Sequence, residues 1–146
     1  APYVARLRDL VAAHPASCHY FDRHDEALAR LVFAGSDAFL VPSIYEPCGL
    51  TQMYALRYGS VPVVRETGGL KDTVTHYDPH AGTGNGSVFK HADGQGLAWA
   101  ISEVLGWYRQ PVTWDRLRQN GMAADFSWQH QAPRYAELYG RLAGWK

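Results

Sequence analysis

The succession of a strand, a loop, a helix and a second strand between residues 38 and 64 constrains the fold more than any other feature of the sequence. Residues 38–41 are all apolar, which is typical of a central strand buried in a parallel sheet. After a loop that contains two prolines, residues 50–58 have helical spacing, and residues 61–64 have the composition of a second strand. The loop of this βαβ unit follows the carboxyl end of a strand, where ligands of open α/β sheets bind.

Helical and strand patterns alternate along the rest of the first half as well. Further helices are expected at about residues 2–13, 26–33, 95–108, 114–124 and 128–142, and further strands at residues 18–21 and 87–90. Asp22 or Asp25 is expected to cap the second helix. The glycine-rich segment 75–86 is expected to be an exposed loop. This order predicts one Rossmann-like α/β domain over residues 1–146, with a parallel sheet, helices on both faces and helices at its end.

The helix expected at residues 50–58 has a predicted orientation. Gly59 is expected to end it, because glycine adopts the left-handed conformation that often follows a helix. Helical spacing assigns its inward face to Leu50, Met53, Tyr54 and Leu56–Arg57.

Composition excludes several classes of function. Fourteen basic and fourteen acidic side chains cancel, so no nucleic acid and no anionic membrane is expected as a partner. Cys18 and Cys48 are far apart and are expected to be free thiols in a reducing compartment. No apolar run approaches the roughly 20 residues that span a bilayer, and the N-terminus has no secretion signal. We therefore expect a soluble cytoplasmic domain.

A metal site is the weakest of the candidate sites. His76 and His80 are four residues apart, but Pro79 argues against a helix there, and no carboxylate or thiol completes a ligand set. We expect neither a metal nor a cofactor. The sequence also lacks the flanking patterns of a serine nucleophile elbow and of a Cys–His pair.

The loop before the helix at residues 50–58 combines an acid with a glycine. Gly49 lets the backbone approach a ligand, and the N–H groups of Gly49, Leu50 and Thr51 would be unpaired at a helix start, where anions bind. Glu46 can accept hydrogen bonds from hydroxyl groups. This combination suits a sugar phosphate, but a capped helix beside a surface acid explains it as well. Residues 67–70 form a second glycine turn, which either needs a positive φ or contacts a ligand.

Specific motifs surround these residues. Glu46-Pro-Cys-Gly-Leu-Thr-Gln52 is preceded by Val41-Pro-Ser43 and followed by Ala55-Leu-Arg-Tyr-Gly59 and Thr67-Gly-Gly-Leu-Lys-Asp-Thr-Val74, and Asp125-Phe-Ser-Trp128 comes near the end. From about Asp25 onward the chain resembles bacterial glycogen synthases and plant starch synthases, which are retaining glycosyltransferases that use a nucleotide sugar. The resemblance implies the later part of the second, donor-binding domain of a two-domain enzyme.

The resemblance also implies a role for each loop residue. Glu46 matches the acid that holds sugar hydroxyls beside the reacting carbon. The backbone groups of Cys48 and Gly49 resemble those that reach the far hydroxyls of the glucose. The amides of Leu50 and Thr51 resemble those that hold the distal phosphate.

Two more positions complete the implied site. Tyr54 stands where many related transferases have a second glutamate and the glycogen synthase branch does not, which supports that branch; Tyr54 is also expected to bind the substrate. His24 stands where the family has a flat residue against the nucleobase; a solvent-exposed loop histidine is the alternative. The implied reaction transfers glucose from ADP-glucose, with retention, to the 4-hydroxyl of an α-1,4-glucan, and the departing diphosphate takes the acceptor proton.

Several family features have no counterpart in this sequence. The resemblance implies a basic pair upstream that clamps the diphosphate, and a first domain that binds the glucan acceptor and carries a histidine near the reacting sugar. We therefore expect this chain to be inactive alone and to self-associate through apolar side chains such as Trp128 and Tyr135. A non-catalytic nucleotide-binding or interaction module of the same fold, and a retaining transferase with another donor, are the alternatives.

Overall fold

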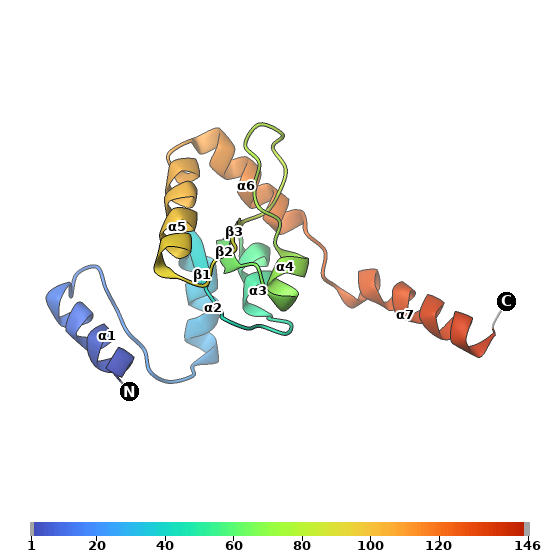
Figure 1. The fold of residues 1–146 in the computed structure, drawn as a ribbon, viewed down its shortest axis with the longest axis horizontal. Helices are drawn as coiled ribbons and strands as arrows, with labels where there is room; N and C mark the ends of the chain where they lie inside the picture. Colours follow the sequence, from blue (N-terminus) through green and yellow to red (C-terminus); the bar gives the residue numbers. More distant parts are fainter. Residues whose placement is uncertain (1, 145–146) are drawn as a thin grey trace.

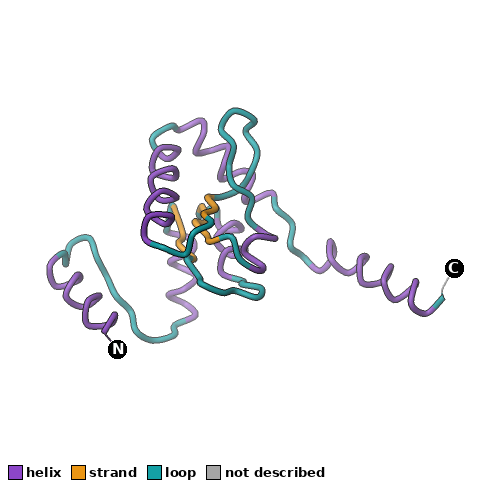
Figure 2. The backbone as a smooth tube through the Cα atoms, viewed as in Figure 1, coloured by secondary structure: helices purple, strands orange, loops and turns teal. Residues whose placement is uncertain are grey.

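The structure, a computed structural model, describes residues 2–144 and has a small parallel sheet with helices packed against it (Figures 1 and 2). The elements follow one another as α1 (Pro2–Ala13), α2 (Glu26–Gly35), β1 (Ala38–Val41), α3 (Thr51–Tyr58), β2 (Val61–Arg65), α4 (Gly68–Thr73), β3 (Ser87–Phe89), α5 (Gly94–Tyr108), α6 (Pro111–Ala123) and α7 (Trp128–Ala143). The α/β fold class predicted from the sequence is confirmed, including the helices at the end of the chain.

The sheet has the order β1-β2-β3, and both pairings are parallel. β2 is the central strand, and its first four residues are buried. Because side chains alternate along a strand, Val61 and Val63 face a core cluster with residues of α5 and α6, whereas Val64 packs with Leu70 and Val74 on the other side. The carboxyl ends of β1 and β2 therefore lie side by side, and the loops that follow them meet there.

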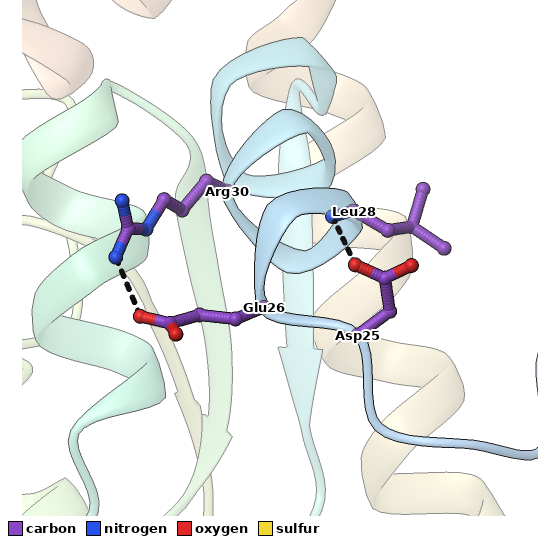
Figure 3. Close-up of polar contacts among 4 residues, drawn as sticks. All are labelled: Asp25, Glu26, Leu28 and Arg30. Atoms are coloured by element: carbon purple, nitrogen blue, oxygen red, sulfur yellow. Dashed lines mark hydrogen bonds and ion pairs between the residues drawn. The ribbon is translucent and has the colours of Figure 1, made fainter.

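Local capping explains where α2 begins (Figure 3). Asp25 is the N-cap, and its carboxylate accepts a hydrogen bond from the Leu28 N–H at 2.9 Å. Glu26 and Arg30 form an exposed ion pair one turn apart on the same helix. Asp22, the other candidate cap, instead pairs with Arg8 at 3.1 Å.

The helices at the two ends project from the body of the molecule on opposite sides (Figure 1). α7 has no buried residue among those described, and Trp128 at its start is 72 % exposed. Leu138, Tyr139 and Leu142 are exposed farther along α7, as is Tyr135, whose ring centroid lies 6.0 Å from that of Trp128. None of the described helices is long and apolar enough to cross a membrane.

Two expectations about strands are wrong. Residues 18–21 are not a strand, because the segment pairs with no other strand in the described part of the chain and Phe21 is exposed. β1 is not central: it lies at an edge of the three-stranded sheet, and Leu40 is 45 % exposed. An apolar run predicts a strand, but it does not reveal whether a neighbouring strand covers it.

The expected inward face of α3 is only partly right. Leu56 is buried, as predicted, and Met53 is half-buried, but Leu50 and Tyr54 are about half exposed, and the other buried residues are Gln52 and Ala55. The prediction assigned the buried face mainly to apolar residues, but the polar side chain of Gln52 is fully buried on it. Gly59 ends the helix in the left-handed conformation, as predicted, with a φ of 78°.

The segment 75–86 is more ordered than an exposed loop. Tyr77 is only 2 % exposed and belongs to the main core cluster. The Asn85 side chain accepts a hydrogen bond from the Thr75 N–H at 2.8 Å, and Asn120 of α6 donates to the carbonyls of Gly82 and Gly84 at 2.9 and 2.8 Å. The side-chain amides of Asn85 and Asn120 thus pair backbone groups that no neighbouring strand pairs. The segment runs alongside α6 (Figure 1).

Candidate functional site

The candidate site is the loop 42–50, between β1 and α3. Arg65, the last residue of β2, anchors the first part of this loop: its Nε donates to the Ser43 carbonyl at 2.8 Å, and its guanidinium also bonds the Ile44 carbonyl. The Arg65 side chain thus donates hydrogen bonds to two successive backbone carbonyls just after the end of β1. The sequence gives no signal for this role, because Arg65 lies more than twenty residues from its partners.

The second glycine turn packs directly beneath the loop. The Gly69 N–H donates to the Glu46 carbonyl at 3.1 Å. A Cβ on Gly68 would lie 1.9 Å from the Glu46 carbonyl oxygen, and one on Gly69 would lie 1.9 Å from that of Cys48. Gly68 also has a φ of 43°. The two glycine motifs therefore form one unit, and both glycines are needed for the close approach; a direct ligand contact by the turn stays a prediction.

The start of α3 presents unpaired amides. Gly49 is left-handed, with a φ of 74°, and Leu50, the N-cap, is right-handed and makes no side-chain capping bond. Within residues 2–144, no acceptor is found for the N–H groups of Gly49, Leu50 and Thr51. A left-handed residue followed by a right-handed one turns successive N–H groups the same way, which makes a concavity for an anion. The positive end of the helix dipole adds to it.

Glu46 lies beside these amides. Its side chain is half-buried, and its carboxylate has no hydrogen-bond partner among the described residues. A Cβ placed on Gly49 would lie 3.1 Å from the Glu46 Cγ, so the acid packs directly against the glycine. The site therefore offers amide donors for an anion and, next to them, a carboxylate that can accept from hydroxyl groups.

The other predicted residues lie in the loop and in the first half of α3. Cys48 and Thr51 are exposed, and Leu50 and Tyr54 line a depression of about 400 Å³. Tyr54 packs edge-on against Phe33 of α2, with ring centroids 5.8 Å apart.

The Asp125–Trp128 motif lies near the start of α3. Residues 124–127 form the other wall of the depression that Leu50 and Tyr54 line. Hydrogen bonds from Ser127 lower the pKa of Asp125, since they stabilise the carboxylate. The motif that contains Leu50 and the motif that contains Asp125 are distant in sequence, but they border the same depression.

His24 does not join this group. It lines a separate depression of about 260 Å³ with Phe21, Phe33 and Phe39, and no residue of the loop 42–50 contributes to that lining. Its proposed contact with a nucleobase stays a prediction.

His76 has a structural contact. Its Nδ1 accepts a hydrogen bond from the Val88 N–H at 3.1 Å, on the edge strand β3. Burial lowers the pKa of His76, and the nearby Glu103 partly opposes this shift. In the part of the chain that the structure describes, no three His, Cys, Asp or Glu side chains are grouped so that they could hold a metal ion.

Comparison with known proteins decides the family. Residues 2–120 match the family described as Glycosyl transferases group 1. The chain belongs to this family. It is 47 % identical over 140 residues to a glycogen synthase of Rhodospirillum rubrum and 49 % identical over 137 residues to one of Syntrophotalea carbinolica. These matches cover 96 % and 94 % of the chain, but only 29 % and 28 % of the two relatives.

Solved structures of the family have the same fold. The catalytic domain of starch synthase IV from Arabidopsis thaliana, bound to ADP and acarbose, aligns with a TM-score of 0.83 and 39 % identity, over 97 % of this chain and 30 % of that one. A sucrose-phosphate synthase from Thermosynechococcus elongatus aligns with a TM-score of 0.67 and 25 % identity, over 97 % and 35 %. The chain thus spans about a third or less of these relatives, and the resemblance to the glycogen and starch synthases is confirmed.

Proposed function

We propose that this chain is the donor-binding part of a glycogen or starch synthase, which transfers glucose from ADP-glucose, with retention, to the 4-hydroxyl of an α-1,4-glucan. The observation that carries the proposal is the row of unpaired amides at the start of α3 beside the unpartnered carboxylate of Glu46. A nucleoside diphosphate sugar presents the matching groups, an anionic phosphate next to a ring of hydroxyls. The ADP bound to the Arabidopsis relative supports the nucleotide half of this proposal.

The residues have separate roles in the proposed reaction. The amides of Leu50 and Thr51 bind the distal phosphate and stabilise the negative charge that develops on the leaving diphosphate. Glu46 accepts hydrogen bonds from the sugar hydroxyls and stabilises the positive charge that develops on the ring, while the backbone of Cys48 and Gly49 holds the far hydroxyls. The departing diphosphate takes the acceptor proton, so no protein base is required.

The remaining contacts follow from the same proposal. Tyr54 borders the substrate, and His24 stacks against the nucleobase. The protein acts in the cytoplasm, where its two cysteines, both free in the structure, stay reduced. The glucan acceptor binds outside this chain, so the chain alone transfers no glucose; label from ADP-glucose entering glycogen above a blank would contradict this.

The direct test is calorimetric titration of this chain with ADP, ADP-glucose, UDP and UDP-glucose. We expect ADP-glucose to bind more tightly than ADP, and both more tightly than the uridine ligands. Glu46→Ala should remove the advantage of ADP-glucose over ADP, because a charge-assisted hydrogen bond contributes about 1.5–3 kcal/mol. It should leave ADP affinity nearly unchanged. Glu137→Ala, an exposed acid on α7, is the matched control.

Turnover of a full-length enzyme that contains this segment provides a second measure. Glu46→Ala should lower turnover by more than the binding loss, because its contact strengthens as charge develops on the sugar ring. Glu46→Gln keeps the shape and one acceptor, so it should lie between wild type and alanine. Wild-type turnover in Glu46→Ala, or an equal loss of ADP affinity, would overturn the role of Glu46. Absence of nucleotide binding in that full-length protein would favour an interaction module of the same fold.

A further inference from the structure

Gln52, the second residue of α3, is a polar side chain with no exposed surface. Its Nε2 lies 2.9 Å from the Gly49 carbonyl oxygen, 3.2 Å from that of Cys48 and 3.1 Å from the Thr73 Oγ1. Its Oε1 is buried and has no partner among the described residues. A buried acceptor without a partner is unfavourable. The favourable contribution of the Gln52 side chain therefore comes from the hydrogen bonds that its Nε2 donates.

The two carbonyls that Gln52 binds determine where the site amides point. A trans peptide unit is planar, and its N–H is directed opposite to its C=O. Because the carbonyls of Cys48 and Gly49 both turn toward Gln52, the N–H groups of Gly49 and Leu50 turn away from it, toward the surface. A Cβ on Gly49 would lie 2.6 Å from the Gln52 Oε1, so only glycine leaves room for this arrangement.

Thr73 connects this arrangement to the second glycine turn. Its Oγ1 accepts from Gln52 and donates to the Gly69 carbonyl at 2.6 Å. The Gly69 N–H in turn donates to the Glu46 carbonyl. The hydrogen bonds thus run from the loop through Gln52, Thr73 and Gly69 back to the loop at Glu46. One circuit holds both the amides and the carboxylate-bearing residue of the site.

We propose that Gln52 and Thr73 are positioning residues that fix the amides of Gly49 and Leu50, and the backbone of Glu46, in the orientation that binds a nucleoside diphosphate sugar. Neither side chain needs to touch the ligand; both act through the carbonyls of the loop 42–50. The identity of the ligand rests on the proposed function, whereas the orientation of the amides does not.

The test compares Gln52→Glu, Thr73→Val and Thr73→Ser in this chain. Gln52→Glu keeps the shape but turns a carboxylate toward two carbonyl oxygens, and Thr73→Val keeps the shape but removes the hydroxyl. We expect each to lower ADP affinity by at least about tenfold. Thr73→Ser retains the hydroxyl and should restore most of the affinity.

Gln110→Glu is the matched control. Gln110 also donates from Nε2 to a carbonyl four residues earlier, that of Gly106 at 3.2 Å, but it is exposed and far along the chain from the site. We expect it to leave ADP affinity unchanged. Thermal unfolding of every variant shows which ones are folded during the titration, and the conservative Thr73→Val keeps the test usable if Gln52→Glu does not fold.

A second measurement, without ligand, separates this inference from the proposed function. Residual dipolar couplings of the Gly49 and Leu50 amides report their orientation directly, and hydrogen exchange reports their protection from solvent. We expect both to change in Thr73→Val and to return toward wild type in Thr73→Ser. Unchanged couplings in folded Thr73→Val, or wild-type ADP affinity in it, would overturn the positioning role. Altered couplings in Thr73→Val, together with no ADP binding by a full-length protein that contains this segment, would overturn the proposed function alone.

Discussion

Gly69→Ala tests whether the two glycine motifs form one unit. Gly69 lies in the first turn of α4 and has no positive φ, so alanine suits its backbone. The added Cβ would nevertheless lie 1.9 Å from the Cys48 carbonyl oxygen, whereas ordinary contacts begin at about 3.4 Å. The loop 42–50 or α4 must therefore move by about 1.5 Å to remove the overlap.

That movement breaks specific bonds. It separates the Gly69 N–H from the Glu46 carbonyl, now 3.1 Å apart, and the Gln52 Nε2 from the Cys48 carbonyl, now 3.2 Å apart. Leaving such buried groups unpaired costs about 1–3 kcal/mol each, so we expect the free energy of unfolding to fall by about 3 kcal/mol. With a urea m-value of about 2 kcal/mol per molar, the unfolding midpoint falls by roughly 1.5 M.

Gly106→Ala is the control, with the opposite expected sign. Gly106 lies in the last turn of α5, and nothing is within 4 Å of the place where its Cβ would be. Replacing a glycine in a helix by alanine stabilises by about 0.5–1 kcal/mol. Urea unfolding of both variants, with ADP titration of the folded protein, measures the effect. Equal midpoints for Gly69→Ala and Gly106→Ala, with ADP affinity retained, would refute the close packing of the two motifs.

Two further predictions concern other parts of the molecule. Burial holds the pKa of His76 below its usual 6.5, so the unfolded chain binds the proton more readily than the folded chain. The contribution of neutral His76 to the free energy of unfolding is therefore fully present above about pH 6.5 and is lost as the pH falls toward the lower pKa of the folded state. Urea unfolding between pH 5 and 7.5 should show this slope, His76→Gln should flatten it, and an equal slope in both proteins would contradict the assignment. The exposed aromatic residues of α7 should cause self-association, so sedimentation velocity should detect oligomers in the wild type and mainly monomers in a Trp128→Ser, Tyr135→Ser variant. Monomers in both proteins at high concentration would exclude this surface as the cause.

The sequence predicted most of the elements, because their signals are local; the exception among the helices is α4, which was expected to be a glycine turn. Asp25, Gly59 and the apolar runs of β1 and β2 fix where elements begin and end, and each signal lies within a few residues of its effect. The βαβ order also predicted that the loop 42–50 lies at the carboxyl ends of the parallel strands, which is where the candidate site is proposed.

The errors share a different cause. Whether the residues 18–21 pair as a strand, and whether β1 is covered, depends on neighbours that no local pattern specifies. The buried face of α3 was assigned to its apolar residues, yet the position nearest the loop is occupied by Gln52. A buried amide cannot be distinguished from a surface one by periodicity, because its partners are main-chain carbonyls and one distant threonine.

In the proposed site, the motifs extend beyond the residues that would face a ligand. An amide that binds an anion must be oriented before the anion arrives, and its orientation is fixed by whatever holds the carbonyl on the other side of the same peptide. Here those groups are Gln52, Thr73 and the two glycines of the second turn, none of which needs to reach the ligand. Substitutions at these positions should therefore impair binding as strongly as substitutions at Glu46 impair sugar recognition. The Gln52 and Thr73 variants distinguish these two kinds of loss, because they should weaken ADP and ADP-glucose alike, whereas Glu46→Ala should weaken only the sugar nucleotide.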